Sequence, residues 1–315
     1  MSIATATPRR LPLDALATGA MLLLCVCWGF QQIAIKLVAD DVAPIMQIGL
    51  RSTFAALVLA VVVWRGEGRR AFTDGTILPG LIVGLLFAGE FLFVAQGLVH
   101  TTASHMSVFL YTAPIFAALG LHWLLPEERM KPLQWLGVAI AFCGIAVAFL
   151  VKDSQPAAPG GAAGNMLLGD AMGLLAGLLW GATTVAIRKT SLSEAAPAKT
   201  LFYQMAVASV GLLAFAAATG QHGIRYTPAA MLSVGFQSVV VALSSYLAWF
   251  WLLRRYLASR LSILSFMTPL FGVSFGVLIL DEPLDAGFVI GAAMVLAGIT
   301  LVSGAEMVRQ LLRRR

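Results

Sequence analysis

The sequence is poor in charged side chains. Asp, Glu, Lys and Arg together make up 11% of the 315 residues, whereas hydrophobic residues make up 59%. A soluble domain usually carries about 25% charged residues. The apolar residues also come in uncharged blocks of about 20, the length that a helix needs to cross the hydrocarbon core of a bilayer. This composition excludes an ordinary soluble domain and predicts an integral membrane protein.

Residues and motifs that carry chemistry are scarce as well. The three cysteines, Cys25, Cys27 and Cys143, fall inside apolar blocks and lack the paired spacing of a zinc site or a disulfide framework. The spans contain no His-Glu-x-x-His motif, paired aspartates or Ser/His/Asp set, and the chain has no Walker A lysine motif. We therefore expect no enzyme activity, no cofactor and no metal, and no use of ATP unless a separate subunit hydrolyses it.

Ten apolar blocks stand between charged or Pro- and Gly-rich breaks. The first fifteen residues precede an apolar run that is too long for a signal-peptide core, so we expect this segment to be retained. The blocks predict an all-α membrane protein in two groups of five helices, residues 1–151 and 168–315, joined by a Gly-, Ala- and Pro-rich linker at 152–167. The expected spans are 16–36, 44–64, 77–98, 103–125, 133–151, 168–187, 197–219, 229–253, 261–280 and 286–305.

The net charge of +6 is spread over short basic clusters between the apolar blocks. A nucleic-acid-binding surface would gather these charges in one stripe, so we expect no nucleic-acid partner. Cytoplasmic loops retain Lys and Arg, and 17 of the 21 basic residues lie inside if the N-terminus does. Of the others, Lys36, Lys152 and Arg225 lie outside and Arg51 lies within a span. This count predicts a multi-pass protein of the inner (plasma) membrane with both termini in the cytoplasm.

The two groups of helices repeat the same residues in the same order. Trp28-Gly29 and Lys36 match Trp180-Gly181 and Arg188, and Ala43-Pro44 matches Ala196-Pro197. Later matches, at offsets between 152 and 155, are Ala103-Ser104 with Ala258-Ser259, Ser107 with Ser262, Pro114 with Pro269, Glu127 with Glu282, Gly137 with Gly291, and Gly144 with Gly298. The pattern indicates a duplicated five-helix unit.

An odd number of spans forces the second copy to enter the membrane from the opposite side. The charges agree, because Arg129 and Lys131 align with the uncharged Leu284 and Ala286. Inverted repeats of this kind place a binding site near the midplane, where the halves meet, and alternate its access by rocking. The architecture therefore favours transport.

These repeated residues resemble the ten-helix EamA type of the drug/metabolite transporter superfamily, which includes metabolite and amino-acid exporters. The resemblance covers nearly the whole chain and rests on Trp-Gly followed by a basic residue, the proline in each fourth helix, and the glutamate with the Gly-rich helix after it. It implies two-fold pseudosymmetry and a central cavity lined largely by the first, third and fourth helices of each half. Glu128 after Glu127 departs from the family pattern at that loop.

Two charges are predicted at membrane depth. Arg51 lies seven residues after Pro44 and Glu90 eight residues before Leu98, so each is about 10–12 Å deep at 1.5 Å per residue. Such charges are costly in a bilayer and suggest function. An Arg51–Glu90 pair could bind a zwitterion, or Glu90 could exchange a proton against the solute; a structural ion pair between the helices is the alternative.

Polar and aromatic side chains gather on the helices expected to line the cavity. Apolar walls with a few hydrogen-bonding groups suit a small amphipathic or aromatic solute, although helix-to-helix hydrogen bonds and interfacial belts use the same residues. Lys36 and Arg188 are expected to snorkel to opposite interfaces, and His100 and His105 show no metal-ligand spacing. The candidate path residues are Gln31, Gln32, Arg51, Glu90, Gln96, Tyr111, Tyr203, Gln204, Tyr246 and Trp249.

The sequence thus favours a secondary exporter of small metabolites such as amino acids, with the proton gradient as the default energy source. An intramembrane enzyme or lipid-processing protein, and a passive channel or scaffold, are the alternatives. The expected partners are a small-molecule substrate and membrane lipid, and the chain could work as a monomer or a homodimer.

Overall fold

A computed structural model describes residues 14–68, 71, 73–150, 165–256, 261 and 264–312. Most of the predicted linker and both chain ends lie outside these residues. The described chain is helical and contains no strand, only an isolated bridge between Val42 and Ile224. The longer elements are α1 (Ala15–Leu37), α2 (Pro44–Glu67), α3 (Ile77–His100), α4 (Ala103–Leu110), α5 (Ala113–Leu124), α6 (Pro132–Leu150), α7 (Met166–Lys189), α8 (Pro197–Ala218), α9 (Pro228–Gly235), the π-helix η4 (Phe236–Ser245), α10 (Tyr246–Arg255), α12 (Met267–Leu280) and α13 (Ala286–Leu312).

The described helices match the predicted pattern of spans. Nine stretches of described helix are long and apolar enough to cross a membrane, counting α4 with α5, and α9 with η4 and the start of α10 to Trp249; α12 is a shorter apolar helix. Pro44 and Pro197 occupy the first turn of α2 and α8, where a missing N–H costs nothing. The chain is a multi-pass membrane protein.

The two halves run in opposite directions. Lys36, in the last turn of α1, donates a hydrogen bond to the Thr101 carbonyl, and the Thr101 hydroxyl donates to Asp170 in the second turn of α7. The end of α1 and the start of α7, its repeat mate, therefore lie at the same side of the molecule, on either side of Thr101, which confirms the predicted inversion. We call this side of the molecule the His105 end, and the opposite side, where α8 begins, the Lys199 end.

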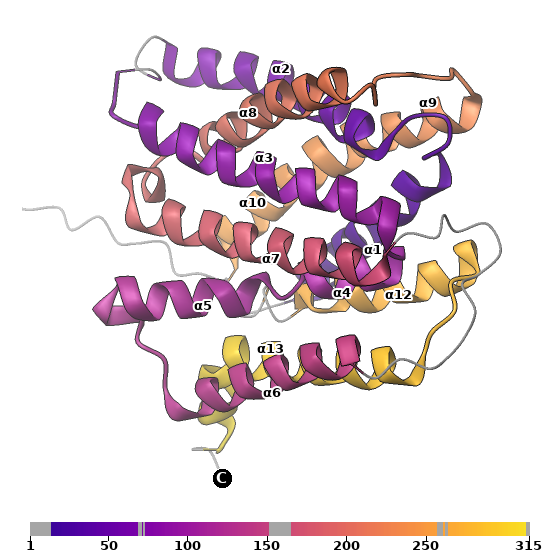
Figure 1. The fold of residues 1–315 in the computed structure, drawn as a ribbon. Coiled ribbons are helices and arrows are strands. Elements are labelled where there is room, and N and C mark those ends of the chain that lie inside the picture. The colour runs from indigo at the N-terminus through magenta and orange to yellow at the C-terminus, as the bar shows by residue number, and fades with distance from the viewer. Residues whose placement is uncertain are drawn as a thin grey trace, which may run out of the picture.

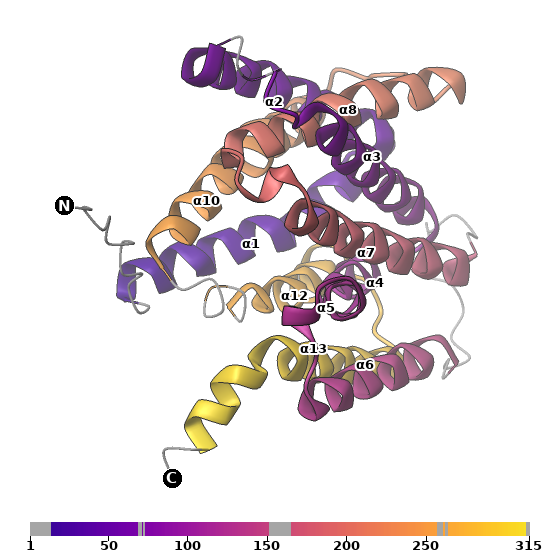
Figure 2. The same cartoon turned by 90° about the vertical axis from the view of Figure 1, so that its left-hand side faces the viewer.

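The helices form layers (Figures 1 and 2). The pair α2 and α8 lies at one edge, the pair α6 and α13 at the other, and α1, α3, α4, α5, α7, α10 and α12 lie between them. Each edge pair consists of one helix from each half, packed against its counterpart in the repeat. Between α6 and α13 the backbones touch: a Cβ on Gly144 would lie 2.7 Å from the Gly291 carbonyl oxygen, so only glycine fits.

The fourth helix of the first half is interrupted. The predicted span 103–125 is two helices, because α4 ends at Leu110 and α5 begins at Ala113 with Pro114 in its first turn. Proline has no N–H to continue the ladder of helical hydrogen bonds. In the second half, a turn at Phe266, the repeat mate of Tyr111, precedes α12 and its Pro269. Both halves thus break a helix at the same place, at mid-bundle.

Candidate transport site

Two opposite charges are buried in the middle of the bundle. Arg51 on α2 and Glu90 on α3 are 3% and 4% exposed. The Arg51 guanidinium lies 4.5 Å from the centre of the Phe91 ring and interacts electrostatically with Glu90 and Tyr246. Arg51 and Glu90 do not form an ion pair within 4.0 Å, and the Arg51 Nη1 and Glu90 Oε2 atoms have no hydrogen-bond partner among the described residues. The expected pair therefore shares one region without direct contact.

Aromatic side chains from both halves surround these charges. Tyr111, at the break between α4 and α5, interacts electrostatically with Glu90 and Tyr246, and its ring meets Trp180 of α7 edge-on at 5.2 Å. We call Arg51, Glu90, Tyr111 and Tyr246 the central cluster. It draws on both halves of the repeat, near the break in the fourth helix.

Trp28 on α1 extends this aromatic surface. Its ring centre lies 6.4 Å from that of Tyr246 and 5.9 Å from that of Trp249, and its indole N–H donates to the Ser245 hydroxyl at 2.8 Å. Gln31 and Gln32, also on α1, are 7% and 3% exposed, and the Gln32 Oε1 atom has no partner in the described chain.

Three other predicted path residues lie elsewhere. Gln96 donates to the Gln221 side chain beyond the end of α8, and the Tyr203 hydroxyl shares a hydrogen bond of 3.1 Å with Thr76 at the Lys199 end. Gln204 is half-buried on α8. The structure therefore gathers Arg51, Glu90, Tyr111 and Tyr246, with Trp249 joined to them through Trp28, and leaves Gln96 and Tyr203 in contacts near the ends of helices.

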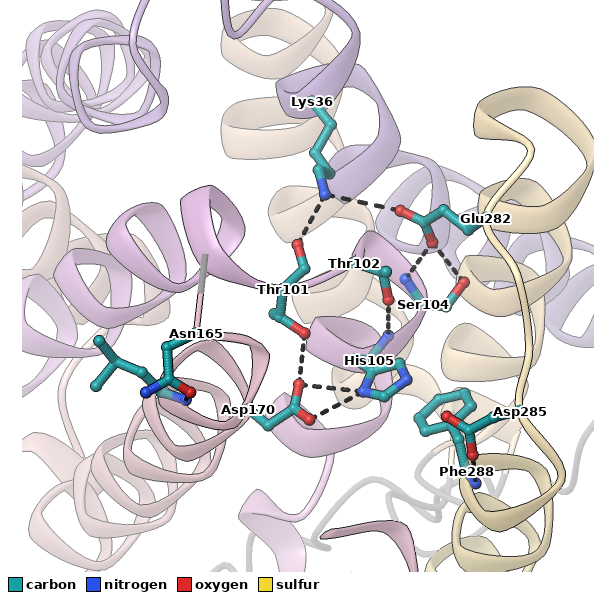
Figure 3. A network of polar contacts seen from close by, with 11 residues as sticks. Lys36, Thr101, Thr102, Ser104, His105, Asn165, Asp170, Glu282, Asp285 and Phe288 are labelled. Atoms are coloured by element: carbon teal, nitrogen blue, oxygen red, sulfur yellow. Dashed lines mark hydrogen bonds and ion pairs between the residues drawn. The ribbon is translucent and has the colours of Figure 1, made fainter. Parts of the chain in front are cut away.

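A second polar cluster closes the His105 end (Figure 3). The His105 Nδ1 atom lies 3.0 and 3.1 Å from the two Asp170 carboxylate oxygens, and both side chains are at most 3% exposed. Beside them, Glu282 accepts hydrogen bonds from the backbone N–H groups of Ala103 and Ser104, at 2.7 and 2.9 Å. A carboxylate at a helix N-terminus satisfies free N–H groups and matches the helix dipole. Glu282 of the second half thus caps α4 of the first.

Lys36 contacts Glu282 directly and is linked to Asp170 only through Thr101. Its ammonium donates to the Thr101 carbonyl at 2.7 Å and lies 3.9 Å from Glu282. The expectation that Lys36 only snorkels to an interface is therefore incomplete, since the side chain bridges the two halves. We call Lys36, Thr101, His105, Asp170 and Glu282 the His105 cluster.

A third cluster closes the Lys199 end. The buried Lys199 ammonium, on the first turn of α8, donates to Asp74 at 2.6 Å and to Glu67 at 3.0 Å. The hydrogen bond from Lys199 is the main reason that the pKa of Asp74, in the loop before α3, falls to about 2. Thr76 donates to the same carboxylate at 2.7 Å. We call Lys199, Glu67, Asp74 and Thr76 the Lys199 cluster.

Sequence reasoning missed the partners in both end clusters. Asp170 stands inside an apolar block, five residues into its helix, and the sequence pattern assigned it no role. Glu282 was recognised as a repeat mate of Glu127, and Lys36 as a mate of Arg188. The available signal was that Glu282 and the Ala-Ser pair at the start of the fourth helix both recur, which suggests contact between them.

The chain matches a model of the EamA-like transporter family twice, over residues 16–150 and 167–304. The protein belongs to the EamA-like transporter family. The two matched segments agree with the internal repeat, and the family places the protein in the drug/metabolite transporter superfamily that the sequence resembles.

Several relatives that are named as transporters or efflux pumps match this chain over most of their length. An uncharacterized transporter of Bacillus subtilis, YoaV, is 24% identical over 280 residues, which are 86% of this chain and 91% of that protein. A probable amino-acid metabolite efflux pump of Escherichia coli is 25% identical over 289 residues, 88% of this chain and 91% of the pump. A solved crystal structure has the same fold, with a TM-score of 0.63 at 17% identity, and the match covers 95% of this chain and 99% of that one.

Proposed function

We propose that this EamA-family transporter is a secondary active exporter of small zwitterions such as amino acids, which it moves by alternating access through the central cluster. The observation that carries the proposal is the separation of two buried opposite charges. Arg51 and Glu90 are each at least 96% buried, yet each keeps a polar atom without a partner. Buried charges left incompletely paired are strongly destabilising, so a protein that keeps them has a use for them.

A zwitterion supplies what both side chains lack. Its carboxylate can take the free Arg51 N–H in a charge-assisted hydrogen bond, and its ammonium can donate to Glu90 Oε2. A structural ion pair, the alternative, would bring the two side chains into direct contact. Their separation favours the ligand-binding role. The aromatic rings of Tyr111, Trp180 and Trp28 offer an apolar surface to a side chain of the solute.

The inverted repeat supports alternating access. The His105 and Lys199 clusters each join the two halves at one end of the bundle, so a solute reaches the central cluster after one of them separates. The distribution of Lys and Arg supports an orientation with the His105 end outside the plasma membrane and the Lys199 end, with both chain termini, in the cytoplasm. The E. coli relative's name, a probable amino-acid metabolite efflux pump, agrees with export. We infer that the proton gradient supplies the energy.

The test is uptake of a labelled amino-acid panel into proteoliposomes, with and without an imposed pH gradient. The parent chain is compared with Glu90→Gln, and Glu128→Gln, at a partly exposed carboxylate paired with Arg188, is the matched control. We expect saturable, gradient-dependent flux in the parent and the control, and at least a tenfold loss in Glu90→Gln. Equal flux in all three removes Glu90 from the path. Flux that does not saturate indicates a channel, and no flux of any solute favours an enzyme or a scaffold.

A further inference from the structure

The two helix breaks bring a second polar group next to the central cluster. Tyr111 lies at the break in the first half, and Thr268 is the second residue of α12, just after the turn at Phe266 in the second half. The Tyr111 side chain interacts with Thr268, and electrostatically with Glu90 and Tyr246. Tyr111 therefore connects the charges proposed to bind the head of the solute to a hydroxyl group on α12.

The Thr268 hydroxyl is buried and has no partner. The residue is 1% exposed. Tyr111 and Cys25 lie beside it, but no atom of the described chain is placed to form a hydrogen bond with its Oγ1 atom. Buried polar groups are nearly always hydrogen-bonded, and each exception needs an explanation. Next to a binding site, a group of the bound solute is the partner that satisfies such a hydroxyl.

The break in the helix explains why this hydroxyl is free. A threonine inside a helix commonly bonds to the carbonyl four residues earlier, as Thr183 does to Leu179 at 2.9 Å. For Thr268 that carbonyl belongs to Leu264, which lies before the turn, and it accepts from the Cys25 thiol at 3.3 Å. The fold thus takes away the usual backbone partner of Thr268 and leaves its hydroxyl available to a ligand.

The two polar residues at the breaks are not part of the duplicated scaffold. In the repeat alignment that matches the two prolines, Tyr111 corresponds to Phe266 and Thr268 to Ala113. Each half therefore has a polar side chain where its repeat mate is apolar. Packing of a two-fold scaffold does not require this difference, whereas a solute with a charged head and a distinct side chain is itself asymmetric and meets different groups on its two sides.

The chemistry around Thr268 selects the kind of side chain. A hydroxyl both donates and accepts, so it can pair with a hydroxyl or an amide group. A carboxylate or ammonium on the side chain would bring a third charge into the buried site, where the head of the solute already matches Arg51 and Glu90. An unpaired buried charge is strongly destabilising, so a charged side chain is excluded.

We propose that Thr268 binds the side chain of the solute, so that the exporter selects zwitterions whose side chain carries a hydroxyl or amide group. This assignment rests on the proposed function and deepens it, because Arg51 and Glu90 bind the head. The carbon chain of the solute lies along the Tyr111 and Trp180 rings, and its polar end hydrogen-bonds to Thr268.

Pairs of ligands that match in shape test the assignment. Threonine and valine, asparagine and leucine, and tyrosine and phenylalanine differ little in size, but only the first member of each pair carries the hydrogen-bonding group. Calorimetric titration of the full chain in detergent micelles gives a dissociation constant for each. A site built to hydrogen-bond a ligand group rejects the analogue that lacks it, so we expect at least about a tenfold preference for the polar member of the pair that fits best.

Substitutions at Thr268 should change this preference and not binding in general. Thr268→Val removes the hydroxyl at nearly constant shape and should bring the preference below about twofold, whereas Thr268→Ser keeps the hydroxyl and should keep the preference. Thr183→Val is the matched control, because it changes a threonine that is 3% exposed but bonded to its own helix. If Thr268 were only structural, Thr268→Val would weaken both members of a pair by the same factor.

The amines obtained by decarboxylating each ligand separate this inference from the proposed function. A parent chain that binds amino acids without preferring the polar member of any pair overturns the role of Thr268 and leaves the exporter in place; this result needs no variant. A preference among the amines that Thr268→Val abolishes, in a chain that binds no amino acid, supports Thr268 and contradicts the zwitterion. A chain that binds no member of the panel overturns both.

Discussion

The two ends of the molecule are closed by ion clusters of different character. At the His105 end, the Asp170 and Glu282 side chains are 2% and 7% exposed. At the Lys199 end, the Lys199 ammonium is buried, but its partners Glu67 and Asp74 are 31% and 42% exposed. We call the His105 end, whose carboxylates are buried, the dry end, and the Lys199 end, whose carboxylates are partly exposed, the hydrated end. Because solvent screens exposed charges strongly and buried charges weakly, the two ends should respond differently to substitution, pH and salt.

The difference arises where the two repeats have diverged. His105 aligns with Arg260, and Asp170 and Lys199 have no charged mate in the other half. The His105 cluster thus combines duplicated residues, Lys36 and Glu282, with His105 and Asp170, which have no counterpart of the same kind in the other half.

The largest effect on stability is expected from Glu282→Gln at the dry end. The amide can accept through one oxygen only, so an N–H at the start of α4 loses its charged partner. Leaving a buried donor unsatisfied costs about 1–3 kcal/mol. Equilibrium unfolding in mixed detergent micelles measures the change, with Glu128→Gln as the control that should fall within about 0.5 kcal/mol of the parent. Equal losses in the two variants would contradict the dry closure.

A smaller effect is expected from Lys199→Met at the hydrated end. The substitution removes a buried cation, but Glu67 and Asp74 remain in reach of water and keep their hydration. Partly exposed ion pairs contribute about 0–1 kcal/mol, so the same unfolding assay should show a loss below that of Glu282→Gln. A larger loss for Lys199→Met would reverse the comparison.

The contribution of the Lys199 end to the stability of the fold should change with pH only in the acid range. Lys199 and Thr76 hold the pKa of Asp74 at about 2, below its ordinary 3.8. A carboxyl group whose pKa is lower in the folded than in the unfolded state stabilises the fold at pH values above its unfolded-state pKa. This contribution disappears as the pH falls from 3.8 to about 2. Unfolding measured from pH 6 to pH 2 should therefore show a constant difference between the parent and Asp74→Asn above about pH 5, and convergence below it. A difference that persists at pH 2 would show that Asp74 acts through something other than its charge.

The smallest effect should be that of salt. Raising the ionic strength from about 0.1 to 1 M shortens the screening length from about 10 to 3 Å. The stability gap between the parent and Lys199→Met should shrink, while the gap for Glu282→Gln should stay the same. Unfolding at the two salt concentrations measures both gaps, and equal shrinkage would mean that water reaches both closures.

Much of the fold was predictable because the bilayer imposes strict rules. Span length, the count of five per half and the repeated Trp-Gly, proline and glutamate positions predicted an inverted pair of five-helix units, as the structure shows. The break in the fourth helix was only partly predicted. Pro114 was recognised as a repeated position and removes a helical hydrogen bond, but the full interruption at Tyr111 was not predicted.

The sites were less predictable, because contacts between the halves depend on packing that no local pattern encodes. Arg51 and Glu90 were recognisable as charges at the same depth, yet their separation required coordinates. Tyr203 is a tyrosine like Tyr111 and Tyr246 of the central cluster, and Gln96 was an equally plausible path residue, but both contact neighbours near the ends of helices. Asp170 became visible as a partner of His105 only when α7 was placed beside α4.

The central claim, that Arg51 and Glu90 bind the two charges of a zwitterion, is tested most directly by binding measurements with trimmed ligands. The amino acid that binds best is compared with its decarboxylated amine and its deaminated acid, in the parent, Arg51→Gln and Glu90→Gln. Charge-assisted hydrogen bonds of about 1.5–3 kcal/mol predict that losing the carboxylate weakens binding to the parent at least about tenfold, but leaves binding to Arg51→Gln unchanged. In the same way, Glu90→Gln should bind the deaminated acid as tightly as it binds the amino acid. If the loss of affinity from substituting the side chain and the loss from trimming the ligand are independent, so that the two factors multiply, then neither side chain contacts the ligand group assigned to it.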